Sequence, residues 1–228
     1  MEEAIDIETI KKAAEYSKKV YYREGFSKNE KFYEDAGSDT QCLVVKEGKT
    51  IYIVFRGTTN TKDWVTNLNI IPIKTPFGKI HGGFYGAWKK IYRVLLGEAN
   101  ISDLIESSEN VVICGHSLGG ALSSICAAAL AMYHPNQHFS CITFGGPRVG
   151  SRSFRKYFNK MENISCKRFA VQADPVPRIP SCIFYRHVND GVILDRHLTY
   201  CGCLLDISCS PTDDHDMDNY LSLIYELD

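Results

Sequence analysis

The sequence lacks any long hydrophobic run. Its longest apolar stretch, residues 125–133, is nine residues long, whereas a membrane-spanning helix needs about 20. The first residues are acidic and contain neither the basic segment nor the apolar segment of a secretory signal peptide. The sequence on its own therefore predicts a cytoplasmic protein without a transmembrane segment.

An excess of charge of one sign is also missing. The chain has 26 Lys and Arg residues against 27 Asp and Glu residues, for a net charge near −1. Binding to nucleic acid through a basic surface is therefore not expected. We also find no internal repeat and no low-complexity tract, so the 228 residues are expected to form a single domain spanning residues 1–228.

Segments typical of strands and of helices alternate along the chain. The predicted strands cover residues 42–45, 51–55, 111–114, 139–144 and 166–171. The predicted helices cover residues 5–22, 84–96, a short stretch to 107, 118–133, 151–159 and 213–228. The first two strands are expected to form a hairpin, and a second hairpin is expected to turn at residues 189–191. Apolar strands alternating with helices indicate an α/β fold whose mostly parallel central sheet has helices on both faces.

Ser117 lies in a Gly-x-Ser-x-Gly motif between a predicted apolar strand and a predicted helix. A serine at such a strand-to-helix turn is held in strained backbone angles, with its hydroxyl at the carboxyl end of the sheet. Glycines at positions 115 and 119 would let the strand and the helix approach closely. The motif predicts a nucleophile, and the alternative is a serine that only caps the helix. The neighbouring His116 is expected to pack rather than to act as a base.

A serine nucleophile needs a histidine base oriented by a carboxylate. In a fold with this kind of turn, the chain order is serine, then the acid, then the histidine. Asp174 is the favoured acid, because it follows a predicted strand and is followed by Pro175 and Pro177. Asp190 and Asp195 lie at or beside the predicted second hairpin, where aspartate is common in turns.

Four histidines downstream of Ser117 are candidates for the base. His138 precedes Asp174 and therefore violates the chain order, while His187 and His197 lie near the predicted second hairpin. His215 lies in a loop directly before the last predicted helix, from which it can return over the serine. We therefore favour His215.

Two backbone N–H groups are candidates for an oxyanion hole. One belongs to Leu118, which directly follows the serine at the start of the helix. The other belongs to Thr58, in the loop after the strand that ends at Phe55, and Gly57 would permit a tight turn there. The alternative for this loop is an ordinary strand-ending turn with local hydroxyl hydrogen bonds.

Five motifs together resemble one known family. They are residues 55–58, 115–120, 144–150, 174–178 and 214–220. In this order they are similar to the class 3, or fungal-lipase-like, lipases of the α/β-hydrolase superfamily, and they cover about residues 40–225. The resemblance implies an α/β-hydrolase fold and hydrolysis of lipid esters by a Ser-His-Asp triad through an acyl-enzyme, without a cofactor. It makes Ser117 the nucleophile, Asp174 the orienting acid and His215 the base, with Thr58 and Leu118 as oxyanion donors.

The same resemblance places a candidate lid directly after the oxyanion threonine. Residues 61–68 are expected to form a short helix with Trp64, Val65 and Leu68 on one side. As a lid, this face would cover the site in water and open onto lipid in a transient contact with the lipid interface. The alternative is a surface helix that packs permanently on the core.

The chain has nine cysteines, an odd number, and we expect them to be mostly reduced thiols. Cys201, Cys203 and Cys209 lie close together in the sequence with His197 nearby. Their spacing matches no standard zinc pattern, so structural thiols are favoured over a metal site. Two further functions stay open at this point: a lipase-fold protein that binds lipid or a protein partner without catalysis, and an acyltransferase that uses the same triad.

Overall fold

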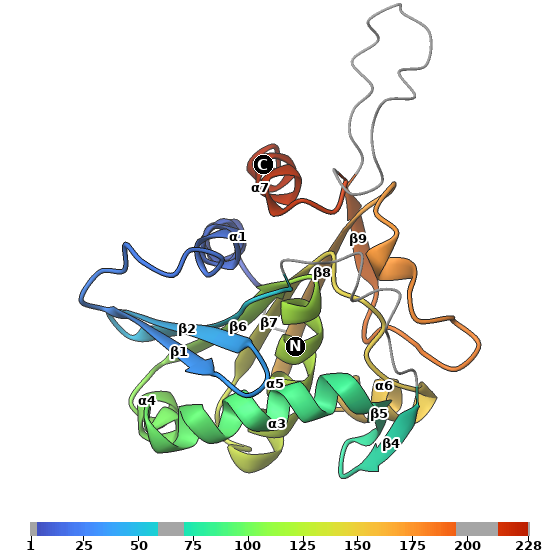
Figure 1. The fold of residues 1–228 in the computed structure, drawn as a ribbon, viewed down its shortest axis with the longest axis horizontal. Helices are drawn as coiled ribbons and strands as arrows, with labels where there is room; N and C mark the ends of the chain where they lie inside the picture. Colours follow the sequence, from blue (N-terminus) through green and yellow to red (C-terminus); the bar gives the residue numbers. More distant parts are fainter. Residues whose placement is uncertain (1–3, 59–70, 195–213, 228) are drawn as a thin grey trace, which may run out of the picture.

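A seven-stranded sheet forms the centre of the computed structural model, which describes residues 4–58, 71–194 and 214–227. The order of its strands is β1-β2-β3-β6-β7-β8-β9 (Figure 1). Their bounds are β1 (Glu30–Asp35), β2 (Thr40–Glu47), β3 (Thr50–Phe55), β6 (Asn110–His116), β7 (Phe139–Phe144), β8 (Ile164–Val171) and β9 (Gly191–Leu194). From β3 to β9 all neighbouring strands are parallel, and only β1, β2 and β3 pair antiparallel. The expected mostly parallel sheet is confirmed.

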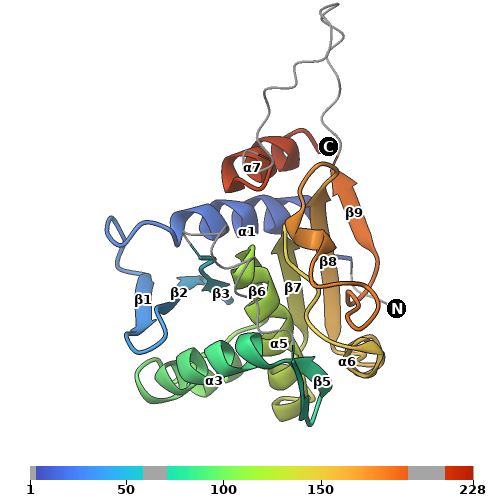
Figure 2. The ribbon, with the colours of Figure 1, turned by 45° about the vertical axis from the view of Figure 1, so that its right-hand side comes forward.

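Helices cover both faces of this sheet. On one face lie α1 (Ile7–Lys19) and α7 (Met217–Tyr225), side by side in both ribbon views (Figures 1 and 2). The other face carries α3 (Gly82–Gly97), α4 (Ile101–Glu106), α5 (Leu118–Tyr133) and α6 (Arg152–Phe158). Alternate residues of the strands face opposite layers. In β6, for example, Val111 and Ile113 pack with α3 and α5, whereas Val112 and Cys114 pack with α1 and α7.

The helix α5 is buried along nearly its whole length. Its residues from Gly119 to Ala131 are all buried, which its Ala-rich sequence permits because small side chains let it lie close to the strands. This deep position anchors the start of α5, where Ser117 lies, in the centre of the molecule.

The two hairpin predictions have opposite outcomes. Strands β2 and β3 form the expected hairpin, with Glu47 paired to Thr50. The second hairpin is wrong: β9 is parallel to β8, and residues 184–188 form no strand. Asn189, at a φ of 44°, adopts the left-handed conformation that the turn sequence suggested. It serves there as the bend into an edge strand rather than as the turn of a hairpin.

Three strands were not predicted. Strand β1 forms the edge of the sheet, and its two aromatic residues, Phe32 and Tyr33, lie between two pairs of charged residues. A separate two-stranded sheet consists of β4 (Pro72–Thr75) and β5 (Gly78–His81). Two isolated β-bridges extend this small sheet: Ile80 pairs with Gly150, and Gly150 pairs with Arg186.

Several predictions fall outside the described residues. They concern the candidate lid residues, one histidine, one aspartate and the cysteine cluster: Trp64, Val65, Leu68, His197, Asp195, Cys201, Cys203 and Cys209. Within the described ranges six cysteines are unpaired, of which only Cys182 is exposed. None of the helices in these ranges is long and apolar enough to cross a membrane.

Candidate active site

Ser117 lies at a sharp turn between β6 and α5. Its backbone has φ 58° and ψ −127°, an unfavourable conformation for a residue with a Cβ atom. The Ser117 N–H donates to the carbonyl of Phe144, and the Ser117 carbonyl accepts from the Gly120 N–H. The Ser117 hydroxyl makes no capping hydrogen bond, so the alternative that this serine merely caps the helix is not supported. The strained turn is the elbow that the motif predicts.

Two glycines allow α5 to approach the sheet at this turn. A Cβ atom on Gly119 would collide with the carbonyl oxygen of Phe55, the last residue of β3. A Cβ atom on Gly115 would lie 2.6 Å from the Gly119 carbonyl carbon and 2.7 Å from the Phe55 carbonyl oxygen. The glycines on either side of Ser117 are therefore required by backbone packing.

The structure brings Asp174 and His215 together, although 41 positions separate them. The Nδ1 atom of His215 lies 2.8 Å from Oδ2 of Asp174, and both side chains are buried. The His215 ring lies 4.6 Å from the ring of His116, the residue before Ser117. The Asp–His pair therefore lies beside the serine elbow. Neither Ser117 Oγ nor His215 Nε2 has a hydrogen-bond partner among the described residues.

Two further donors hold the Asp174 carboxylate. The Tyr220 hydroxyl donates to Oδ2 over 2.5 Å, and the Val176 N–H donates to Oδ1 over 2.8 Å. The same Tyr220 hydroxyl accepts from the Val171 N–H, which ties α7 to the end of β8. Burial, together with the adjacent Asp174 carboxylate, raises the pKa of Tyr220 far above its usual range. Tyr220 therefore stays a donor to a carboxylate that has no contact with water.

Gly145 makes room for this carboxylate. It has a φ of 59°, in the left-handed region that glycine adopts readily. A Cβ atom there would lie 2.9 Å from Asp174 Oδ2 and 3.0 Å from the Tyr220 hydroxyl oxygen. The loop after β7 thus needs a glycine at this position for conformational and steric reasons.

His116 packs against His215, as expected for a residue that is not the base. Its Nδ1 lies 2.8 Å from the Tyr21 hydroxyl oxygen. Burial, and secondly the nearby His215, lowers the pKa of His116 well below its usual value. His116 is therefore neutral, and its Nδ1 shares a hydrogen bond with the Tyr21 hydroxyl. This arrangement places a neutral, hydrogen-bonded ring against the face of His215.

The predicted oxyanion residues lie next to Ser117. A Cβ atom on Gly57 would lie 3.1 Å from the Ser117 Cβ atom and would collide with the Tyr21 hydroxyl. Thr58 follows this tight approach directly and is half-buried. Leu118 begins α5, and the first N–H groups of a helix have no partner within the helix. The positions of Thr58 and Leu118 are therefore compatible with the expected donor role.

The rejected candidates have other partners. His138 Nε2 lies 3.0 Å from Ser165 Oγ, and His187 Nε2 donates to the Pro177 carbonyl over 2.7 Å. Asp190 is exposed, with its Oδ1 3.9 Å from the Arg155 guanidinium. None of these three side chains contacts Asp174 or His215 through a described hydrogen bond.

Sequence reasoning gave no role to two tyrosines of the site. Tyr220 lies in the 214–220 motif that contributes to the family resemblance, and this motif is the signal that the sequence offers for it. No comparable signal exists for Tyr21, which reaches His116 across 95 positions.

A strand–elbow–helix serine beside a buried Asp–His pair, at the carboxyl edge of a mostly parallel sheet, defines an α/β-hydrolase. Comparison with known proteins narrows this class. The sequence model of the family described as "Lipase (class 3)" matches residues 52–184, more than half of the chain. The chain belongs to the class 3 lipase family.

Individual relatives agree with this assignment. The chain is 29% identical to a secreted mono- and diacylglycerol lipase of Fusarium solani over 183 residues, 71% of this chain and 52% of that protein. It is 33% identical to a lipase of Rhizomucor miehei over 158 residues, 64% of this chain and 42% of that protein. The chain thus spans about half the length of the curated relatives that it matches.

The fold is also similar to a solved structure. It superposes on the Rhizomucor miehei lipase–propeptide complex with a TM-score of 0.74 and 25% identity, covering 82% of this chain and 68% of that one. The α/β-hydrolase fold predicted from the sequence is confirmed.

Proposed function

We propose that the chain is a carboxylic ester hydrolase that acts on lipid esters, with Ser117, His215 and Asp174 as its catalytic triad. The observation that carries this proposal is the buried Asp174–His215 pair beside the strained turn of Ser117. Membership of the class 3 lipase family supports the reaction class. The name of the Fusarium relative supports acylglycerols as substrates.

In the first half of the reaction, Nε2 of His215 removes the proton from Ser117 Oγ as that oxygen attacks the ester carbonyl. The negative oxygen of the tetrahedral intermediate accepts hydrogen bonds from the N–H groups of Leu118 and Thr58, and the Thr58 hydroxyl supplies a third donor. Asp174 stays ionised and stabilises the imidazolium of His215. The intermediate then collapses, His215 gives its proton to the departing alcohol, and an acyl-enzyme remains.

In the second half, His215 takes a proton from a water molecule that attacks the acyl-enzyme. The acid is released and the proton returns to Ser117 Oγ. The acceptor in this step could equally be an alcohol, in which case the same residues perform acyl transfer. Product analysis with and without an added alcohol separates these two outcomes.

The mechanism is tested by the hydrolysis of p-nitrophenyl esters of increasing chain length. Ser117→Ala and His215→Ala should each lower kcat/KM by roughly 10⁴-fold or more. Ser222→Ala, which removes an exposed hydroxyl on α7, is the control and should match the wild type. Unchanged hydrolysis in both triad variants would overturn the mechanism, whereas the absence of hydrolysis by the wild type would favour a lipase-fold protein that binds lipid without catalysis.

A second experiment addresses the lipid interface. Hydrolysis of one ester is measured below and above the concentration at which the substrate aggregates. A lid formed by Trp64, Val65 and Leu68 predicts an abrupt rise in rate at aggregation. A smooth curve would instead favour a helix that packs permanently on the core.

A further inference from the structure

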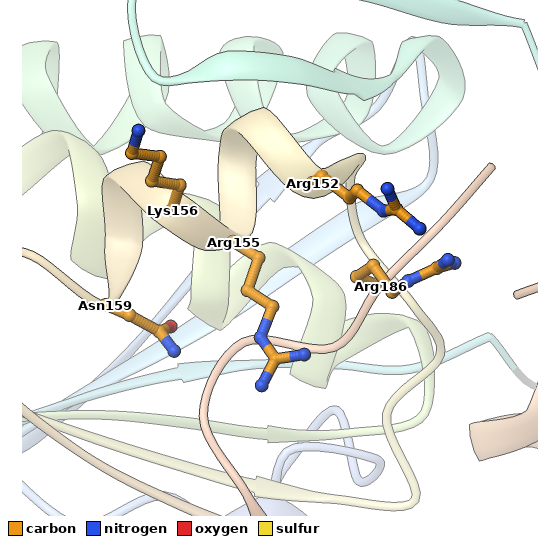
Figure 3. A pocket seen from close by; sticks show the side chains of 5 residues that line it. All are labelled: Arg152, Arg155, Lys156, Asn159 and Arg186. Carbon is orange, nitrogen blue, oxygen red and sulfur yellow. The ribbon is translucent and has the colours of Figure 1, made fainter.

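Three arginines gather at a surface pocket that the proposed catalysis does not use. Arg152, Arg155 and Arg186 line a cavity of about 450 Å³ together with Lys156 and Asn159 (Figure 3). The first two arginines belong to α6, whereas Arg186 lies on the loop between β8 and β9. No acidic side chain is among the described residues that line the pocket. This concentration of positive charge stands out in a chain whose net charge is near −1.

Little within the described structure neutralises this charge. The one ion pair is between Arg155 and the exposed Asp190, at the long distance of 3.9 Å. Arg186 donates to the carbonyl of its neighbour Tyr185, and Arg152 forms no ion pair with a described residue. Figure 3 shows the guanidinium groups of Arg152 and Arg186 extending in the same direction. Guanidinium groups placed in this way suit the oxygens of a phosphate group.

Large apolar side chains are exposed next to these arginines. Ile183 and Phe184, which precede Arg186 in the same loop, are 74% and 66% exposed. Ile73 on β4 is also exposed, and it is connected to Arg186 through the successive pairs Ile73–Ile80, Ile80–Gly150 and Gly150–Arg186. Three such steps correspond to roughly 14 Å. Exposed apolar side chains beside basic ones are typical of a surface that binds anionic lipid.

This surface is separate from the candidate active site. Ser117 follows the carboxyl end of β6, and Asp174 follows that of β8. The basic pocket instead extends along α6 to Asn159, whose Oδ1 accepts from the Asn189 N–H just before the amino end of β9. Helix α6 also covers the face of the sheet opposite α7, the helix that follows His215 (Figures 1 and 2).

We propose that Arg152, Arg155 and Arg186 bind the phosphate groups of an anionic lipid surface, while Ile183 and Phe184 enter its apolar layer. This deepens the proposed function, on which it rests, by naming a surface that attaches the enzyme to the lipid layer in which its ester substrates lie. A soluble phosphate compound would use the arginines but would gain nothing from the exposed apolar side chains.

The test is sedimentation of the protein with phosphatidylcholine vesicles that contain or lack phosphatidylglycerol. The wild type should bind the anionic vesicles more tightly, and added salt should weaken this binding. The variant R152A/R155A/R186A should bind the anionic vesicles roughly 100-fold more weakly, from about 1 kcal/mol per basic residue near such a surface. It should bind neutral vesicles as the wild type does.

The matched control K28A/K31A/K46A removes three exposed lysines near β1 and β2, at the opposite end of the sheet. It should bind both kinds of vesicle as the wild type does. The variant I183S/F184S should bind both kinds more weakly, because it removes the apolar contact and leaves the charge.

The proposal would be overturned by equal binding of the wild type to both kinds of vesicle, or by equal losses of binding in the arginine variant and the lysine control. Arginine-dependent binding of inorganic phosphate without vesicle binding would also overturn it, in favour of a soluble ligand. Hydrolysis of p-nitrophenyl butyrate in solution is measured in parallel. If the wild type hydrolyses this ester but binds both kinds of vesicle equally, only the proposed lipid-binding surface is rejected. If the wild type does not hydrolyse the ester, the proposed function is rejected.

Discussion

The hydrogen bond from Tyr220 to Asp174 makes a quantitative prediction. Tyr220→Phe keeps the aromatic ring, which packs between α7 and the sheet, and removes only the hydroxyl. Asp174 then keeps the Val176 N–H and His215 as partners and loses the donor at 2.5 Å. A hydrogen bond to a charged group contributes about 1.5–3 kcal/mol. If the whole of this is lost from the transition state, kcat/KM falls by roughly 10- to 150-fold.

The change also affects stability, because the Val171 N–H loses its acceptor. An unsatisfied buried donor costs about 1–3 kcal/mol, which urea unfolding can measure. The matched control is Tyr225→Phe, which removes an exposed hydroxyl bonded to Glu15 from the same helix. The assay is the hydrolysis of a soluble p-nitrophenyl ester by folded protein. A Tyr220→Phe enzyme within twofold of wild-type kcat/KM, at unchanged stability, would refute the assigned role of this hydroxyl.

Three further predictions concern neighbouring groups. Gly145→Ala should cost about 1–3 kcal/mol of unfolding free energy for its left-handed backbone, and should lower kcat by displacing Asp174; an alanine variant with wild-type stability and kcat would contradict this. Tyr21→Phe leaves His116 Nδ1 without its hydrogen-bond partner and should destabilise the protein by about 1–3 kcal/mol in thermal unfolding; an unchanged melting temperature would count against the bond. Burial lowers the pKa of His81 to about 4, so the unfolded chain binds this proton more readily and stability falls as pH drops from about 6.5 toward 4. His81→Asn keeps a side-chain acceptor at the start of α3. It should reduce the loss of unfolding free energy between pH 7 and pH 4.5 by about 2–3 kcal/mol. An equal loss of unfolding free energy in the wild type and the variant would exclude His81 as its source.

Most of the sheet could be predicted because buried parallel strands are continuous apolar runs. Strand β6 and helix α5 were predicted to within one or two residues at their ends, and so was the elbow between them. Edge strands carry a weaker signal, since one side of the strand faces solvent. Strand β1 was missed for this reason. At β9, the turn sequence after Asn189 was interpreted as a hairpin, although the partner strand is β8, about 20 positions earlier.

The order of Ser117, Asp174 and His215 along the chain was sufficient to nominate these residues. The distance between them was not accessible from the sequence, because the Asp174–His215 contact depends on how α7 packs beside β8. Tyr21 illustrates the limit. Its contact with His116 exists only because α1 crosses the sheet above β6, and no local pattern records that crossing.

The central claim is that Ser117 is a nucleophile activated by His215. It is tested most directly by treating the protein with a fluorophosphonate probe and locating the adduct by peptide mass spectrometry. The account predicts a single adduct on Ser117 in the wild type, none in Ser117→Ala, and strongly slowed labelling in His215→Ala. Labelling of a different serine, or labelling of Ser117 at the same rate without His215, would contradict it.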